Sequence, residues 1–429
     1  MSQAPAAAEK STILSKETFL SLYLPNLAIS MGQGIATPVI PALAQSFGVS
    51  FELATLVLIL NGLGGLVFTF PIGYMMDRMG RRPVLLIGPF LTAITSILTA
   101  FAPTFELLLL CRFLNGGAQQ MWQLSRLTMI TDTGKDRERG RLITWMQEVM
   151  AFGGLFSPAI GGFVATFWGI QMPFLLYGVL CIVAILPSFK LVKETDPERQ
   201  AGFVGVRESV PWREVVAACW SAQMMAFFAS QFMANFTRGI NMGGMLNLYA
   251  AYKYEVGPDF IGLLASANSF IRLPLGLMTG YVMDRWGRKK TVVPGFSLLT
   301  VAMMFMTSTA LYELPLEFYV AAYLCVTFAQ GITSGNMMVI GSDMAPTRGR
   351  AQWMSLWRFI AATGSQLSPV VFTIVGGLFG YVGAFGIVGF SSLSVALLVG
   401  LLMQETVGRN RDQGPIAPAT VPEPTRPGG

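Results

Sequence analysis

Histidine is absent from this chain of 429 residues, and charged residues make up only 12% of it, against 53% hydrophobic residues. Without histidine, a zinc site loses its commonest ligand, and any proton relay must use carboxylates. So few charges leave too little polar surface to cover soluble domains of this size. The four cysteines show no Cys-x-x-Cys spacing, which argues against a metal or disulfide role. The sequence therefore predicts no metal site and no cofactor, and a lipid bilayer as the main solvent.

Apolar runs long enough to cross a bilayer, about 20 residues each, recur along most of the chain. Backbone groups in lipid must pair within their own segment, so these runs predict helices. We expect an all-α membrane protein with twelve transmembrane helices in two six-helix pseudo-repeats. The seventh predicted span is overlong, and its first part, 212–220, is expected to be an interfacial turn. The predicted spans are 18–44, 53–74, 84–102, 107–131, 142–167, 171–189, 215–251, 260–282, 291–311, 316–341, 351–379 and 382–404.

Basic residues predict the orientation of the chain. Of the 29 lysines and arginines, 23 fall in the even-numbered loops and the two termini, and Lys253 alone falls in an odd-numbered loop. Lysine and arginine are retained on the cytoplasmic side of a membrane. We expect a multi-pass protein of the cell inner membrane with both termini cytoplasmic.

The chain also repeats itself. The segment GYMMDRMGRRP at 73–83 returns as GYVMDRWGRKK at 280–290, which places Asp77 and Asp284 207 residues apart. An Arg-Gly-Arg follows the fourth and the tenth spans. The predicted organisation is a cytoplasmic tail at 1–16, six-helix bundles at 17–189 and 215–405, a cytoplasmic linker at 190–214 and a disordered tail at 406–429.

The repeated loop resembles the central signature of the major facilitator superfamily, and the resemblance extends over about residues 17 to 405. It implies a transporter working by alternating access, in which Asp77 accepts N–H groups at the start of span eleven and forms a conformational latch. A loop that only anchors the chain on the cytoplasmic side is the alternative. The signature residues are Gly73, Asp77, Arg78, Gly80, Arg81, Asp284, Arg285, Gly287 and Arg288.

Other stretches are similar to the exporting branch of that family. Arg112 opens an arginine motif in span four, and the glycine and proline residues of 153–162 resemble the antiporter motif of span five. Ordinary packing of small residues around a proline kink is the alternative for span five. Span one, at 30–41, also resembles drug exporters, although it carries no carboxylate.

Polar residues lie on one face of spans one, four, seven and ten, at helical spacing. These spans line the cavity in the family fold, so we expect their side chains to meet the substrate. Interhelical hydrogen bonding is the alternative for any single residue. The predicted cavity residues, with two from span eight, are Asn26, Gln33, Arg112, Gln119, Gln123, Asn235, Arg238, Asn241, Asn268, Arg272 and Gln330.

Arginines inside spans carry the hypothesis about the substrate. A charged side chain at mid-membrane costs at least about 2.5–3.5 kcal/mol unless it meets water or a partner. Arg238 and Arg272 are predicted nearest the midplane, where they could grip an organic anion through bidentate geometry. Alternatively, they bind helix carbonyls at the kinks beside Gly239 and Pro274.

Glu148 is the one carboxylate predicted well inside a span, at the depth of Arg126 on the preceding helix. A structural salt bridge between the two is the expected arrangement. The alternative is that Glu148 titrates and carries a coupling proton.

Together these features predict a secondary transporter that exports a small organic solute, which is anionic or amphipathic. No phosphate-binding glycine loop, nucleophile elbow or paired intramembrane carboxylate is present, so we expect no use of ATP, no nucleic acid and no enzyme activity. The expected partners are a small-molecule substrate, the bilayer and a coupling proton, and the expected state is a monomer. An organic-anion exchanger, an uptake symporter and a non-transporting membrane sensor or assembly partner remain as alternatives.

Overall fold

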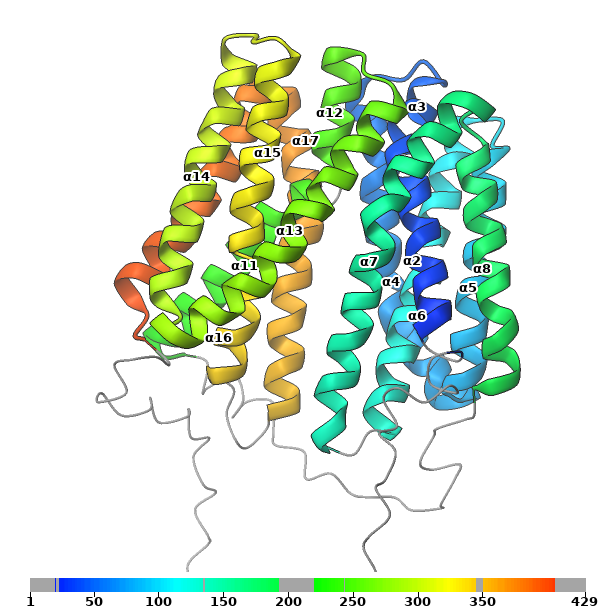
Figure 1. Ribbon diagram of the computed structural model, residues 1–429, viewed down its shortest axis with the longest axis horizontal. Helices are drawn as coiled ribbons and strands as arrows, with labels where there is room; N and C mark the ends of the chain where they lie inside the picture. Colours follow the sequence, from blue (N-terminus) through cyan, green and yellow to red (C-terminus); the bar gives the residue numbers. More distant parts are fainter. Residues whose placement is uncertain are drawn as a thin grey trace, which may run out of the picture. The chain divides into compact units, whose positions relative to one another are not determined.

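The computed structural model describes residues 20, 23–133, 136–192, 220–242, 244–344 and 350–405, and this part of the chain is helical without strands (Figure 1). Nine of its helices are long and apolar enough to cross a membrane, and one of these is a 47-residue stretch, Leu356–Leu402. Gly380 breaks that stretch into two helices, with a non-helical φ of 69°. Two further helices, α6 (Phe105–Thr133) and α11 (Ala222–Met242), are more polar. The twelve predicted spans are therefore confirmed.

The described residues form two compact units. Unit one comprises those within Met1–Ser50, Leu60–Val204 and Glu255–Ser266, and unit two those within Phe51–Ile59, Gly205–Tyr254 and Ala267–Gly429. This division differs from the predicted bundles, because the first residues of α4 (Phe51–Met79) and of α13 (Pro258–Trp286) are grouped with the opposite unit. Besides α6, unit one draws on α2 (Leu24–Ala36), η3 (Thr37–Val39), α3 (Ile40–Gln45), α4 (Phe51–Met79), α5 (Arg81–Ala100), α7 (Asp136–Trp168) and α8 (Met172–Leu191). Besides α11, unit two draws on α12 (Met245–Tyr254), α13 (Pro258–Trp286), α14 (Lys289–Leu311), α15 (Leu316–Ile332), α16 (Asn336–Met344), α17 (Arg350–Leu397) and η4 (Leu398–Leu402).

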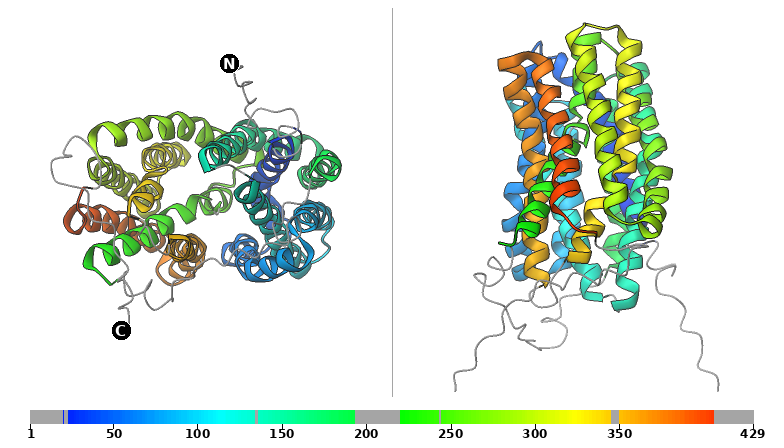
Figure 2. Two further views of the ribbon diagram at one scale, coloured as in Figure 1. Left: turned by 90° about the horizontal axis from the view of Figure 1, so that it is seen from below. Right: turned by 90° about the vertical axis from the view of Figure 1, so that its left-hand side faces the viewer.

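In unit one, α2 packs against α7 and α8, and α5 packs against α6 and α8 (Figures 1 and 2). Glycines allow the closest crossings. A Cβ added at Gly64 of α4 would collide with the Phe113 carbonyl of α6, and one at Gly116 of α6 would collide with the Asn61 carbonyl of α4. Gly161 of α7 lies in the same way against the carbonyl of Ile35. Small residues thus let the helix backbones touch, which is the usual way that membrane helices associate.

Three predicted spans contain a break. In span one, the 3-10 turn η3 separates α2 from α3, and Pro38 and Pro41 remove N–H donors there. Span seven divides into α11 and α12 at Gly244, whose φ is 75°, and span ten divides into α15 and α16 at Gly335, whose φ is 76°. Broken helices expose backbone carbonyls, and membrane proteins tolerate them where they line a cavity or are buried in protein. Residues 212–219 of the interfacial turn predicted at 212–220 lie outside the described residues.

The repeated loop adopts the same turn in both copies. Gly80 and Gly287 have φ values of 96° and 105°, a region that favours glycine. The Gly80 amide donates to the Met76 carbonyl at 3.0 Å, and the Gly287 amide donates to the Met283 carbonyl at 3.1 Å. The internal repeat read from the sequence is therefore also a repeat of backbone geometry.

In unit two, residues 403–405, which follow η4, form hydrogen bonds with the start of α14. The Glu405 carboxylate accepts the backbone N–H of Arg288 at 2.7 Å and that of Lys289 at 3.1 Å, and the Lys289 ammonium donates to the Met403 carbonyl at 3.1 Å. A carboxylate at a helix N-terminus satisfies donors that the helix leaves unpaired and also meets its positive dipole end.

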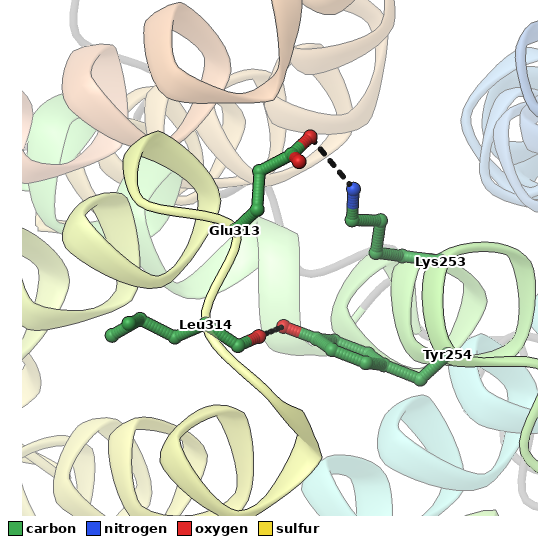
Figure 3. Close-up of polar contacts among 4 residues, drawn as sticks. All are labelled: Lys253, Tyr254, Glu313 and Leu314. Atoms are coloured by element: carbon green, nitrogen blue, oxygen red, sulfur yellow. Dashed lines mark hydrogen bonds and ion pairs between the residues drawn. The ribbon is translucent and has the colours of Figure 1, made fainter.

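The end of α12 contacts the loop between α14 and α15 (Figure 3). The Lys253 ammonium lies 3.3 Å from a Glu313 carboxylate oxygen, and the Tyr254 hydroxyl donates to the Leu314 carbonyl at 3.1 Å. Because Glu313 is 77% exposed, its ion pair with Lys253 contributes at most about 1 kcal/mol. The contact therefore fixes the path of the loop more than it stabilises the fold.

Candidate functional site

A pocket in unit one gathers side chains from four helices. It is open to solvent, and its space of about 350 Å³ includes part of that solvent. Gln33 and Gln123 are exposed at its edge, whereas Asn26, Thr92 and Trp122 are buried. The complete lining is Asn26, Ile29, Ser30 and Gln33 of α2, Pro89 and Thr92 of α5, Gln119, Trp122 and Gln123 of α6, and Met150 of α7. The polar faces of spans one and four, identified from helical spacing, therefore share one pocket.

Hydrogen bonds hold the polar side chains behind the pocket in place. The Gln119 side-chain amide donates to the Asn115 side-chain oxygen at 2.7 Å, and the Asn115 amide donates to the Thr95 hydroxyl at 2.8 Å. The Asn61 side chain of α4 donates to the Arg112 carbonyl at 3.1 Å. The pocket thus rests on a polar network that ties α6 to α4 and α5. Arg112 is buried about two helical turns before Gln119 and does not line the pocket.

Arg126 has a partner that the sequence does not suggest. One of its guanidinium nitrogens donates to the Asn26 side-chain oxygen, and both terminal nitrogens lie 3.7 Å from the Met150 sulfur. The Asn26 amide in turn donates to the Met146 carbonyl at 3.1 Å. Arg126 therefore lies directly behind two residues of the pocket lining.

The salt bridge expected between Arg126 and Glu148 is not formed in the structure. No ion pair joins the described side chains of Arg126 and Glu148, and Glu148 is half-buried with no hydrogen bond to a described residue. Packing of α2 beside α7 gives Arg126 a neutral amide oxygen instead of the carboxylate.

Unit two holds a second polar cluster, formed by helices that correspond to predicted spans seven, eight and ten. The Asn241 amide donates to the Gln330 side-chain oxygen at 2.9 Å, and the Asn268 amide donates to the Asn241 oxygen at 3.3 Å. The Asn268 amide also lies 3.3 Å from the Tyr323 hydroxyl. The Asn235 side-chain amide is not hydrogen-bonded to this cluster and instead donates to the Gln231 carbonyl of its own helix at 2.8 Å.

Arg238 and Arg272 belong to this second cluster. One terminal nitrogen of Arg238 donates to the Thr333 carbonyl, which the break between α15 and α16 exposes, while its Nε is buried without an acceptor among the described residues. Arg272 is close enough for its charge to act on Arg238. No described carboxylate pairs with either arginine. One nitrogen of Arg238 thus binds a helix carbonyl, but this carbonyl lies at the break between α15 and α16 and not at the kinks beside Gly239 and Pro274.

The latch residues lie at the ends of α4 and α13 and in the turns that lead to α5 and α14. Asp77 and Arg78 are exposed, and the Arg78 guanidinium lies 5.6 Å from the centre of the Tyr74 ring. Gly73 has open space around it, Arg81 is half-buried, and the Arg285 guanidinium donates to the Tyr281 hydroxyl at 3.0 Å. The Asp284 side chain and residues 345–349, which precede α17, lie outside the described part, so the predicted latch contact stays a prediction.

Sequence reasoning missed several members of the pocket: Pro89, Thr92, Trp122 and Met150. Trp122 could have been predicted, because it lies three residues after Gln119 and next to Gln123, on the polar face of the same span. Its ring is largely apolar, so the spacing of polar residues does not include it. Whether Met150 and Thr92 line the pocket depends on how α7 and α5 are rotated toward α2 and α6. No local sequence pattern predicts this rotation.

Comparison with protein families finds two matches to the Major Facilitator Superfamily model, over residues 22–250 and 227–427. The two matches overlap at 227–250, and together they cover almost the whole chain.

Among curated proteins, the chain is 23% identical over 254 residues to the quinolone resistance protein NorA of Staphylococcus aureus (strain MRSA252). That alignment covers 58% of this chain and 62% of NorA. The chain is 22% identical over 384 residues to the multi-drug resistance efflux pump PmrA of Streptococcus pneumoniae serotype 4, covering 86% of this chain and 92% of PmrA. Among solved structures, a D-xylose-proton symporter matches with a TM-score of 0.73 at 16% identity, covering 91% of this chain and 98% of the symporter.

Proposed function

The chain belongs to the Major Facilitator Superfamily, and from this membership we propose that it is a secondary transporter that exports a small organic solute by alternating access. The observation that carries the proposal is the pocket of unit one, where the polar faces of α2 and α6 meet over an otherwise apolar wall. Concave apolar sites with a few convergent polar groups are typical of small-molecule binding. The efflux pump PmrA, similar over most of both chains, supports export as the direction.

The proposal includes energy coupling, placement and assembly. Movement is driven by an ion gradient and not by ATP, because the sequence has no phosphate-binding loop. Glu148 is the proposed proton carrier, since it is half-buried inside a span and has no described partner. The protein lies in the cell inner membrane as a monomer, with both termini in the cytoplasm and no catalytic activity. Asp77 and its repeat partner Asp284 form the conformational latch.

Counterflow in proteoliposomes tests transport directly. Vesicles loaded with an unlabelled quinolone should accumulate the labelled compound from outside, because an alternating-access carrier exchanges solute without net energy input. Protein-free vesicles provide the control. A purified, folded protein that binds the quinolone but gives no counterflow would instead fit a non-transporting sensor.

Exchange of organic anions is a second candidate, and Arg238 and Arg272 favour it. Two buried or half-buried guanidinium groups without a described carboxylate partner leave positive charge that an anionic solute would offset. Counterflow measured with a labelled organic anion in place of the quinolone separates the two candidates.

Fusing a reporter enzyme to each terminus tests the proposed orientation.

A further inference from the structure

One side of α4 is exposed along much of its length and ends in a tyrosine and an arginine. Steps of three and four residues separate the members of this stripe, so they share one side of the helix. The other side of α4 packs on α6, through Gly64 and through Met76, whose sulfur accepts the Ser125 hydroxyl at 3.4 Å. The exposed members are Leu63, Val67, Phe70, Tyr74 and Arg78.

The same stripe recurs in α13. Its members lie 207 residues further along the chain, the offset that also separates Asp77 from Asp284. They are again three apolar residues, a tyrosine and an arginine, and all five are exposed: Phe270, Pro274, Leu277, Tyr281 and Arg285. Chemistry and exposure are therefore repeated together in two helices.

The tyrosine and the arginine at the end of the α13 stripe are already joined. The Arg285 guanidinium donates to the Tyr281 hydroxyl oxygen at 3.0 Å, which leaves the hydroxyl proton to donate elsewhere. No described carboxylate forms an ion pair with Arg285. In α4, the Arg78 guanidinium lies 5.6 Å from the centre of the Tyr74 ring. Each stripe therefore ends in a cluster of hydrogen-bond donors that carries a positive charge.

The two parts of each stripe match the two parts of a phospholipid. Exposed apolar side chains of membrane-spanning helices contact acyl chains, and tyrosine and arginine at a helix end lie at the depth of the headgroups. A guanidinium fork binds two phosphate oxygens at once. Further basic residues favour a headgroup with net negative charge over a zwitterionic one. They are Arg81 and Arg82 after the first stripe, and Lys289 and Lys290 after the second.

We propose that each stripe binds one anionic phospholipid. The phosphodiester accepts hydrogen bonds from the arginine and from the tyrosine hydroxyl, and an acyl chain lies along the three apolar residues. A second copy of the chain fits less well, because a symmetric contact brings the same stripe of both copies, and hence their arginines, together. The inference goes beyond the proposed function and holds whether or not the chain carries a solute.

Native mass spectrometry of the purified full-length protein with dioleoylphosphatidylglycerol tests the proposal, and dioleoylphosphatidylcholine is the zwitterionic comparison. Wild type should bind two phosphatidylglycerol molecules more tightly than it binds phosphatidylcholine. Arg285→Gln should raise the Kd of one of them at least about tenfold, the effect of one charged hydrogen bond. Arg285→Lys should recover part of that affinity, because it keeps the charge but not the fork. Tyr281→Phe removes only the hydroxyl and should raise the Kd about 2- to 10-fold.

Lys253→Gln is the matched control. It removes one positive charge from the same unit, but Lys253 lies just before the start of α13, at the opposite end of that helix from Arg285. Phosphatidylglycerol binding should therefore stay unchanged. The substituted residues of the stripes are exposed, so these variants should fold, and their melting temperatures check this.

Three results would overturn the inference. The first is equal phosphatidylglycerol affinity of wild type, Arg285→Gln and a variant that combines Arg78→Gln with Arg285→Gln. The second is equal affinity of wild type for the two lipids. The third is a dimer of the chain that forms in place of the lipid complex.

Discussion

The contact between α4 and α6 gives the sharpest prediction about how the site is held. Gly116 of α6 faces the Asn61 carbonyl of α4 with no room for a Cβ, and Gly64 faces the Phe113 carbonyl in the same way. Gly116→Ala must therefore push two helix backbones apart, because a carbonyl cannot rotate away as a side chain can. The separation would also stretch the 3.1 Å hydrogen bond from Asn61 to the Arg112 carbonyl.

The expected magnitude follows from three terms. Overpacking a tight contact costs about 1–3 kcal/mol. Losing one hydrogen bond adds about 0.5–1.5 kcal/mol. Replacing glycine by alanine within a helix stabilises the helix by about 0.5–1 kcal/mol, which offsets part of these losses. The net loss is about 0.5–4 kcal/mol, which lowers the melting temperature by several degrees, at about 2–4 °C per kcal/mol for a unit of some 200 residues.

Gly386→Ala is the matched control, because Gly386 is a helical glycine around which no atom lies within 4 Å of the place that a Cβ would take. It gains helix propensity without a collision and should melt at or slightly above wild type. Differential scanning fluorimetry of the detergent-purified proteins measures both variants. If Gly116→Ala melted as high as Gly386→Ala, the close approach of α4 and α6 would be refuted as a source of stability.

Three further predictions concern charge. Arg238→Gln should weaken the binding of organic anions at least about tenfold, as loss of one charged hydrogen bond implies. Unchanged binding of every anion in an equilibrium dialysis panel would refute the anion site. Glu148→Gln should abolish uptake driven by a pH gradient in inverted vesicles while leaving counterflow intact, since an amide cannot carry a proton. The exposed Glu106→Gln serves as its control, and gradient-driven uptake equal to wild type would exclude Glu148 as the carrier. Glu405→Gln should lower the melting temperature by a few degrees, because charged acceptors of backbone N–H groups contribute about 1.5–3 kcal/mol. The control Glu317→Gln, in the first turn of α15, should not lower it. Equal melting temperatures of the two variants would show that Glu405 does not stabilise the start of α14.

The sequence alone determined the spans and the repeat. Hydropathy fixes where a chain crosses lipid, because every backbone polar group must be paired within its own helix. The glycine of each repeated loop likewise indicates a turn with positive φ, and Gly80 and Gly287 adopt it. Helical spacing also placed Asn26, Gln33, Gln119 and Gln123 on faces that the structure brings into one pocket.

Tertiary packing decided the partners of those residues. The period of a helix states which side chains share a face, but not which neighbouring helix that face meets or how far the neighbour is rotated. Arg126 therefore binds Asn26 where its position in the sequence suggested Glu148, and Arg238 reaches a carbonyl freed by a break in span ten. The Trp122 indole N–H is unpaired among the described residues for the same reason, because only the arrangement of α2, α5 and α7 around α6 determines whether a buried donor meets an acceptor.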